Sequence, residues 1–196
     1  MPQPFTSLAL LLHHPRADVE LRHHHRVEHE NRRRLHLHGA GSTDVWIEKI
    51  YCGPGHGISI GSLGGTTKEE AGVQNITVRS VVFSGTQNGV RIKTWGRPTN
   101  GFVKGVNFEN IVMRDVQNPV VIDQNYCPGN KNCPGQSSGI NISEVKFKNI
   151  RGSSATEVAV KLDCSPSNPC MGIGLKDINL SYQNMQTLSY CMGSLM

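Results

Sequence analysis

The chain of 196 residues carries a formal net charge of +5, 18% charged residues and 21 glycines. This length suits one domain with a sizeable core or a stack of small repeats, and no apolar run is long enough to cross a membrane. The positive charge favours an anionic partner. Eight of the nine histidines precede residue 39 and His56 is the ninth, so the composition changes near Gly39.

Residues 1–41 contain runs of His and Arg and show no alternation of apolar and polar residues. Such a basic segment is typical of a nucleic-acid-binding arm or a solvated tail. We favour a third interpretation. The segment 31–38 can be encoded so that a shift of one base yields Thr-Gly-Asp-Asp-Cys-Ile-Ser-Ile. We therefore expect an irregular, non-homologous or out-of-frame segment over 1–41 and a folded domain over 42–196.

The stretch 52–62, Cys-Gly-Pro-Gly-His-Gly-Ile-Ser-Ile-Gly-Ser, holds His56 between Gly55 and Gly57. Glycine permits unusual backbone shapes and lets another molecule approach closely. A lone Gly-His-Gly indicates an ordinary turn. Here it is followed by an alternating strand that recurs downstream as Gly89–Lys93, so we interpret His56 as a side chain presented to a ligand.

Five segments after residue 42 share one pattern, which reads apolar, any, apolar, charged or polar, polar, Ile or Val. They start at residues 45, 76, 106, 145 and 173, with separations of 31, 30, 39 and 28. A second short strand follows each of the first four segments, at 58–60, 90–92, 120–122 and 158–160. Period-2 alternation predicts strands with one buried face.

A near-constant interval of short strands, with no helical period between them, is typical of a solenoid. A β-sandwich is the alternative, but it does not require one pattern at regular intervals. We therefore predict an all-β fold, a parallel β-helix. The 39-residue interval contains the segment from Cys127 to Cys133, which we interpret as an insertion.

Stacked coils bring equivalent residues together at about the strand spacing of 4.8 Å. Ile58, Val90 and Val120 are expected inside, and Ser59, Arg91 and Val121 in one outward row. Gly61, Lys93 and Asp123 form the next row. His56 is expected beside Asn88, and Tyr126 just beyond the strands. This face could be an ordinary solvated strand face that carries Arg91 and Lys93. Their position beside His56 favours a binding groove instead.

The six cysteines suit an oxidising compartment. Two pairs can each close a tight loop, Cys127 with Cys133 and Cys164 with Cys170. No ligand set for a zinc ion is complete, so we expect no metal and no cofactor. Three Asn-x-Ser/Thr sequences mark possible N-glycosylation and, with the paired cysteines, favour secretion; they begin at Asn75, Asn141 and Asn179.

The stretch 52–64, together with Arg91-Ile-Lys93 and Gln124-Asn-Tyr-Cys127, closely resembles plant polygalacturonases, the pectin-cleaving glycoside hydrolases of family 28. The resemblance runs from about Gly41 to the C-terminus. It implies a right-handed parallel β-helix, inverting hydrolysis of α-1,4-galacturonosyl links in pectin, and a secreted, cell-wall protein. It assigns His56 to the active site, Arg91 and Lys93 to a galacturonate carboxylate, and Tyr126 to the substrate cleft.

Departures from the family pattern concern the catalytic acids. Inverting hydrolysis needs two carboxyl groups about 6.5–9.5 Å apart. The family takes them from an Asn-Thr-Asp motif and an Asp-Asp pair, and this chain has neither; Arg33-Arg34 stand where Asp-Asp is expected. Asp123 faces the groove, and we expect Lys93 to hold it ionised. The same comparison implies that Cys52 and Cys191 lack partners and that the family domain is incomplete at both ends.

Three hypotheses follow. In the first, the chain is a polygalacturonase-type hydrolase that is inactive because acid and base are absent. The alternative is a non-catalytic pectin-binding β-solenoid that holds acidic pectin through Arg91 and Lys93. A nucleic-acid protein using its basic N-terminus ranks last, because no aromatic stacking platform accompanies the charge. We expect a monomer whose partner is polygalacturonate or pectin, with no nucleic acid and no membrane.

Overall fold

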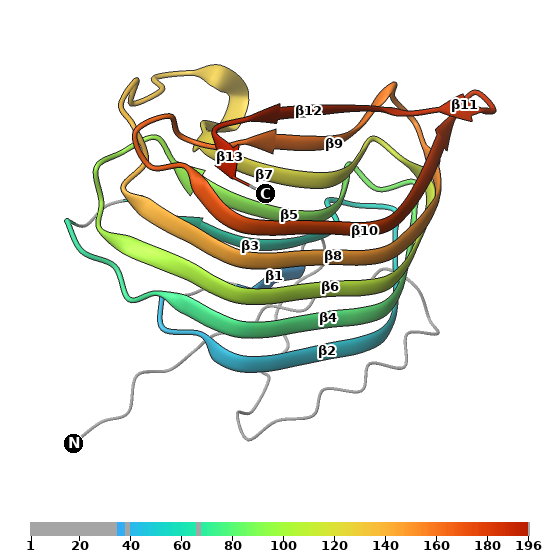
Figure 1. The fold of residues 1–196 in the computed structure, drawn as a ribbon, viewed down its shortest axis with the longest axis horizontal. Helices are drawn as coiled ribbons and strands as arrows, with labels where there is room; N and C mark the ends of the chain where they lie inside the picture. Colours follow the sequence, from blue (N-terminus) through green and yellow to red (C-terminus); the bar gives the residue numbers. More distant parts are fainter. Residues whose placement is uncertain (1–34, 38–39, 66–67, 196) are drawn as a thin grey trace.

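A computed structural model describes residues 35–37, 40–65 and 68–195, which form a stack of β-coils (Figure 1). One wall, here called sheet A, has the order β1-β3-β5-β7-β9-β12, and the opposite wall, sheet B, has the order β11-β10-β8-β6-β4-β2, with β13 also paired to β10. The strands of sheet A are β1 (Leu35–Leu37), β3 (Ile58–Leu63), β5 (Asn88–Trp95), β7 (Asn118–Tyr126), β9 (Val158–Asp163) and β12 (Leu188–Met192). Those of sheet B are β2 (Thr43–Cys52), β4 (Val73–Ser84), β6 (Gly101–Val116), β8 (Ile140–Ser154), β10 (Cys170–Tyr182), β11 (Met185–Gln186) and β13 (Ser194–Leu195).

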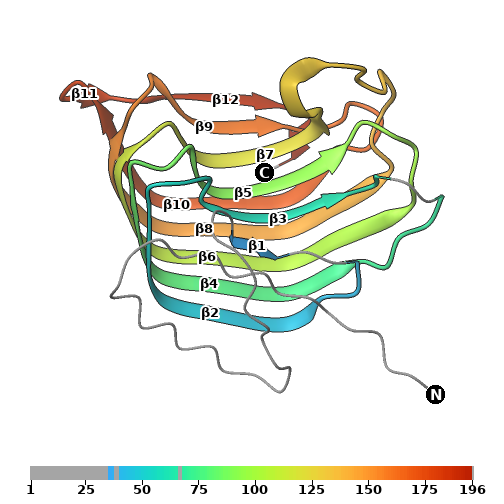
Figure 2. The ribbon, with the colours of Figure 1, turned by 180° about the vertical axis from the view of Figure 1, so that it is seen from behind.

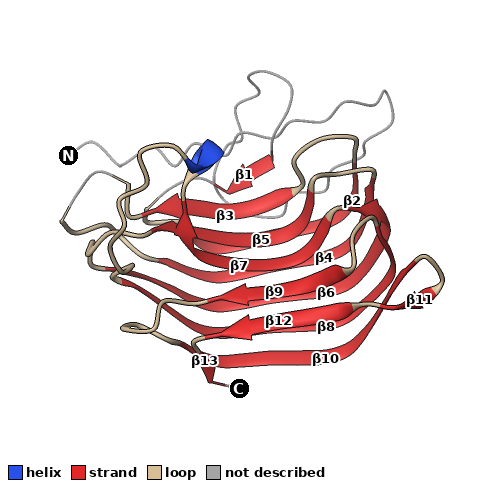
Figure 3. Ribbon diagram, turned by 90° about the horizontal axis from the view of Figure 1, so that it is seen from above, coloured by secondary structure: helices blue, strands red, loops and turns tan. Residues whose placement is uncertain are grey.

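Strands on consecutive coils pair in parallel, as the repeat predicts. In sheet B the five pattern segments align in register, so that Ile47, Val78, Phe108, Phe147 and Leu175 form one row. Figure 2 shows the same stack from behind, and Figure 3 shows the strands of both sheets from above. The predicted parallel β-helix is confirmed.

The fifth position of the pattern has a specific backbone role. In all five coils it adopts a left-handed conformation; it holds Lys49, Ser80, Asn110, Asn149 and Asp177. Asn and Asp tolerate this conformation best among residues with a side chain. Asn149 Nδ2 also donates to Asn110 Oδ1 at 2.8 Å, so the bend is tied from one coil to the next.

The core lies between the two walls and is almost wholly aliphatic and aromatic. Ile58, Val90 and Val120 are fully buried on sheet A, as predicted. Phe108 and Phe147 of sheet B stack with ring centroids 5.2 Å apart. A 3₁₀ turn, η1 (Pro128–Asn130), lies in the insertion after β7. Among the described residues, no helix is long and apolar enough to cross a membrane.

The predicted N-terminal segment is described only in part. β1 lies within it and pairs in parallel with β3, with Leu35 opposite Ile58 and Leu37 opposite Ile60. Residues 1–34 and 38–39 lie outside the described residues, and this includes Arg33 and Arg34. The out-of-frame origin of the segment stays a prediction.

Candidate functional site

The outward face of sheet A carries the predicted rows. Ser59 pairs with Arg91, Arg91 with Val121, and Val121 with Lys161. In the parallel row, Lys93 pairs with Asp123 and Asp123 with Asp163. Register alone therefore places polar and charged side chains from separate coils next to one another, because every strand alternates in the same phase.

Arg91, Lys93 and Tyr126 come together at one point of this face. The Arg91 guanidinium carbon lies 5.7 Å from the centroid of the Tyr126 ring, and Lys93 Nζ lies 4.8 Å from it. Both distances are within the range of cation–π attraction. Arg91 Nε also donates to Ser59 Oγ at 3.2 Å, so the preceding coil orients the guanidinium.

The two cations differ in exposure. Arg91 is half-buried, whereas Lys93 is only 3% exposed. The guanidinium of Arg91 is thus the cation that this face offers to a ligand. The ammonium of Lys93 is covered and adds positive charge nearby. A planar carboxylate matches the guanidinium fork, and the second cation strengthens the attraction at short range.

Trp95 and Arg97 extend this cluster and were not singled out in the sequence. Trp95 meets Tyr126 edge to face at 5.4 Å between ring centroids, and the Arg97 guanidinium carbon lies 5.4 Å from the Trp95 ring. Arg97 Nη1 donates to the carbonyl of Gly65, which fixes it to the loop after β3. Strand register could have indicated that Trp95 lies beside Tyr126. That pairing, however, follows a register shift between Lys93 and Trp95, which the repeat interval does not predict.

His56 lies in the loop before β3 and is half-buried. Its backbone carbonyl accepts a hydrogen bond from Asn88 Nδ2 at 3.1 Å, which confirms the predicted neighbour. Gly57 is needed for a reason different from the expected approach of a ligand. A Cβ at Gly57 would overlap the carbonyl oxygen of Asn88, so the molecule that approaches closely is the next coil of the chain itself.

The expected direction of the Asp123 pKa, lowered by the charge of Lys93, is wrong. The pKa of Asp123 is raised above the ordinary value of 3.8, first because burial penalises the charged carboxylate. The nearby charge of Asp163 raises the pKa further, while the hydrogen bond from Asn125 N and the charges of Lys161 and Arg91 lower it. Desolvation outweighs the favourable charges because the carboxyl group is largely covered.

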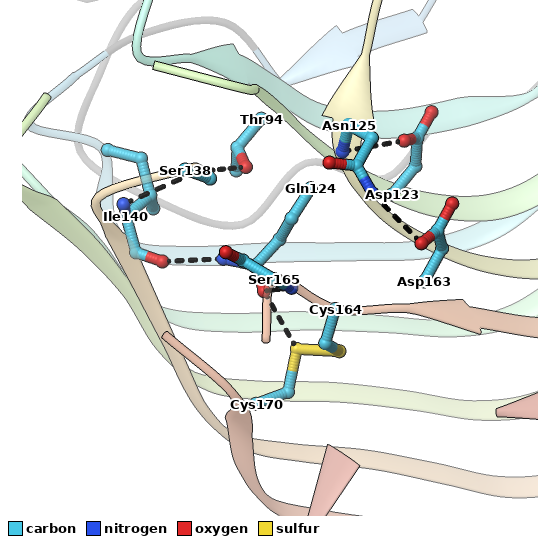
Figure 4. Close-up of a disulfide and its surroundings, with 10 residues drawn as sticks. All are labelled: Thr94, Asp123, Gln124, Asn125, Ser138, Ile140, Asp163, Cys164, Ser165 and Cys170. Atoms are coloured by element: carbon cyan, nitrogen blue, oxygen red, sulfur yellow. Dashed lines mark hydrogen bonds between the residues drawn. A yellow bond between two sulfur atoms is a disulfide. The ribbon is translucent and has the colours of Figure 1, made fainter. Parts of the chain in front are cut away.

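Asn125 links the two carboxyl groups. Its backbone N–H donates to Asp123 Oδ1 and its side-chain Nδ2 donates to Asp163 Oδ1, both at 3.0 Å (Figure 4). Lys161 Nζ lies 3.6 Å from Asp163 Oδ2. Asp163 is therefore the more strongly compensated carboxylate of the pair.

Gln124 holds this strand end from inside. It is fully buried, and its Nε2 donates to the carbonyl of Ile140 while its Oε1 accepts from Ser165 N (Figure 4). These bonds join the end of β7 to the first residue of β8 and to the segment that follows β9. The strand end that carries Asp123, Asn125 and Tyr126 is thus anchored to two other segments of the chain.

The cysteine expectations agree with the structure. Cys127 bonds to Cys133 and Cys164 bonds to Cys170. Within the described residues, Cys52 and Cys191 are free cysteines, the first buried and the second exposed. Burial raises the pKa of the Cys52 thiol to about 11, against a smaller opposing effect of the backbone of Gly57. A buried thiol of this pKa is a structural side chain rather than a nucleophile.

The outward face of sheet A carries cations on β5 and carboxyl groups on β7 and β9. Within β3, β5, β7, β9 and β12, the carboxyl groups are Asp123 and Asp163. They occupy paired positions on neighbouring strands, and Asn125 donates a hydrogen bond to each of them. The described residues contain no group of three or more His, Cys, Asp or Glu suited to a metal ion.

Known proteins resemble this chain over most of its length. The family model of glycosyl hydrolases family 28 matches residues 38–194. A polygalacturonase from Prunus persica is 60% identical over 78% of this chain and 39% of its own length. An exopolygalacturonase from Oenothera organensis is 48% identical over 74% of this chain and 40% of its own length. The chain therefore spans about two fifths of the length of these curated relatives.

A solved structure shows the same fold. The crystal structure of an endo-xylogalacturonan hydrolase from Aspergillus tubingensis aligns with a TM-score of 0.70 and 20% identity. The alignment covers 80% of this chain and 43% of that one. The parallel β-helix described here is thus an architecture already seen in a solved hydrolase.

Proposed function

The chain belongs to glycosyl hydrolases family 28, and on this premise we propose that it is of the polygalacturonase type and binds acidic pectin on sheet A. The convergence of Arg91 and Lys93 on the Tyr126 ring carries the proposal. The guanidinium of Arg91 pairs with the carboxylate of one galacturonate unit, Lys93 adds charge from beneath, and Tyr126 supplies an aromatic wall. His56 borders the site from the loop before β3.

The reaction of the proposed type is hydrolysis of an α-1,4-galacturonosyl bond with inversion. It needs one carboxylic acid to protonate the leaving oxygen and one carboxylate to activate water. Asp123 and Asp163 do not meet this need, since they are adjacent and Asp163 is ion-paired with Lys161. We therefore assign substrate binding to this chain and expect it not to hydrolyse pectin by itself.

Binding to polygalacturonate tests the assignment. The purified chain is expected to bind with an affinity that falls as salt rises, because the contact joins opposite charges at a surface. Arg91→Ala is expected to weaken binding about tenfold or more, since a hydrogen-bonded charge pair contributes about 1.5–3 kcal/mol. Arg151→Ala, an exposed arginine in β8 of sheet B, is the matched control and should leave binding unchanged.

Two outcomes contradict the proposal. Equal affinities of the wild type and Arg91→Ala would remove the role of the cationic cluster. Release of reducing sugar from polygalacturonate by the purified chain would show that acid and base are present after all. The second result leaves substrate binding intact and overturns only the assigned inactivity.

A secreted, cell-wall protein that acts as a monomer completes the proposal. Two disulfides and the exposure of Asn75, Asn141 and Asn179 support an oxidising, glycosylating route. If these sites carry glycans, the protein from a secreting plant cell should lose mass after endoglycosidase treatment. Light scattering of the same sample should give the mass of one chain.

A further inference from the structure

A hollow of about 390 Å³ lies beside the cationic cluster, over the beginnings of β7 and β9. Aliphatic groups of Val121, Val158 and Ala159 form much of its lining, together with Glu157 and Lys161. Its rim is built by hydrogen bonds. Thr156 Oγ1 donates to the carbonyl of Gln117 at 2.6 Å, so the loop before β9 is tied to the coil of β7.

The hollow continues the row that contains Arg91. Val121 is the register partner of Arg91, and Lys161 is the partner of Val121. Neighbouring strands are about 4.8 Å apart, which is close to the length of one sugar unit in a pyranose chain. If the polysaccharide runs across the strands, the sugar unit next to the one held by Arg91 therefore reaches the hollow.

The charge of this region differs from that of the cationic cluster. Glu157 lines the hollow and is exposed, and Lys161 is already engaged by Asp163 at 3.6 Å. Asp123 lies in the adjacent row, and its pKa is raised in part by Asp163. A free carboxylate placed in the hollow is repelled by Glu157 and gains little from Lys161, whose charge Asp163 already engages, whereas a neutral ester is indifferent to both.

The lining also offers contact for a methyl group. Val158 is 37% exposed at the hollow, and Val121 points outward although it is only 6% exposed. Aliphatic carbon of this kind gains from covering a methyl group, and burial of one methyl corresponds to about a fourfold gain in affinity.

We propose that the hollow between β7 and β9 accepts a methyl-esterified galacturonate unit beside the free-acid unit held by Arg91 and Lys93. The inference rests on the proposed function, because it assumes that a galacturonan lies on this face. It makes the preferred ligand a partly esterified pectin, with a free acid at the cationic cluster and an ester at the hollow.

Binding of two probes tests the inference: polygalacturonate without esters, and the same polymer with about half of its carboxyl groups randomly methyl-esterified. The wild type is expected to bind the partly esterified polymer about fourfold more tightly per free-acid unit. Glu157→Gln removes the repelling charge and is expected to tighten binding of the unesterified polymer threefold or more, with little change for the esterified one. Val158→Lys replaces the apolar wall by a cation and should reverse the preference.

Glu109→Gln, which makes the same charge change on sheet B, is the control and should not alter the ratio of the two affinities. The inference is overturned if the wild type binds the esterified polymer more weakly and neither hollow variant changes the ratio, while Arg91→Ala still weakens binding. That outcome leaves the proposed function standing. Loss of all binding to both polymers by the folded wild type defeats the proposed function and this inference with it.

Discussion

Sheets A and B are walls of the same coils, yet they use their outer faces differently. In sheet B the fourth position of the pattern forms a ladder of opposite charges, with Arg79 between Glu48 at 3.4 Å and Glu109 at 3.9 Å. In sheet A the cations Arg91 and Lys93 gather around one aromatic ring instead. A compensated ladder fits a supporting wall, whereas concentrated charge of one sign fits a binding surface.

The comparison also concerns the backbone. Each coil of sheet B has a left-handed residue just before the pattern and another at its fifth position, and rows of large apolar side chains fill the core. In the glycine-rich loop before β3, consecutive coils touch through their backbones at Gly53 and Gly57, a contact that sheet B repeats at Gly152. Damage to sheet B should therefore reduce stability without changing affinity in the folded protein, and damage to the surface of sheet A should do the reverse.

The largest effect is expected from Gly57→Ala. The new methyl group overlaps the carbonyl oxygen of Asn88, and residue 57 has a φ of +82° that a residue with a side chain adopts only under strain. The expected loss of unfolding free energy exceeds about 4 kcal/mol, measured by urea denaturation. Gly85→Ala is the control, since its φ of +59° is similar but nothing lies within 4 Å of the new methyl; its cost should stay near 1 kcal/mol.

A smaller loss is expected from Phe108→Ala in sheet B. Phe108 is fully buried and stacks on Phe147, so the cavity should cost about 3–5 kcal/mol in urea denaturation. Phe102→Ala, at a residue that is 39% exposed, should cost less than about 1 kcal/mol. The folded Phe108→Ala protein should bind polygalacturonate as the wild type does; a loss of affinity would mean that sheet B shapes the binding face.

The smallest effect is expected from Asp123→Asn. Because burial raises the folded-state pKa above 3.8, the ionised carboxylate destabilises the fold at neutral pH, and this penalty disappears as pH falls through the raised pKa toward 3.8. The amide keeps an acceptor for Asn125 N. In urea denaturation, Asp123→Asn should therefore raise the midpoint concentration slightly at pH 7 and leave it unchanged near pH 3. A midpoint that falls at pH 7 would show that the carboxylate is net stabilising.

Several features of the site follow from local pattern. The repeat predicted the pairing of Arg91 with Val121 and of Lys93 with Asp123, because alternation and interval together set the register. The cysteine loops were also predictable, since a separation of six residues closes only a short ring. The role of Gly57 was not predictable, because a close approach depends on which coil lies opposite.

Other features depend on how deeply a side chain is covered, which the alternation of residues in the sequence does not predict. Lys93 was expected to lower the pKa of Asp123, yet covering of the carboxyl group raises it. Lys93 and Val121 point outward by alternation but are almost completely covered. Trp95 and Arg97 join the cluster only because the strand register shifts after Lys93.

The sequence by itself determined the solenoid, its register and the face that carries the cations, because a two-residue period repeated at a near-constant interval admits one way of stacking. The tertiary structure decided which of those side chains meet water, that burial raises the pKa of Asp123, and where an apolar hollow opens beside the cationic cluster. These properties arise from how separate coils cover one another, and that covering depends on distances across the stack rather than along the chain.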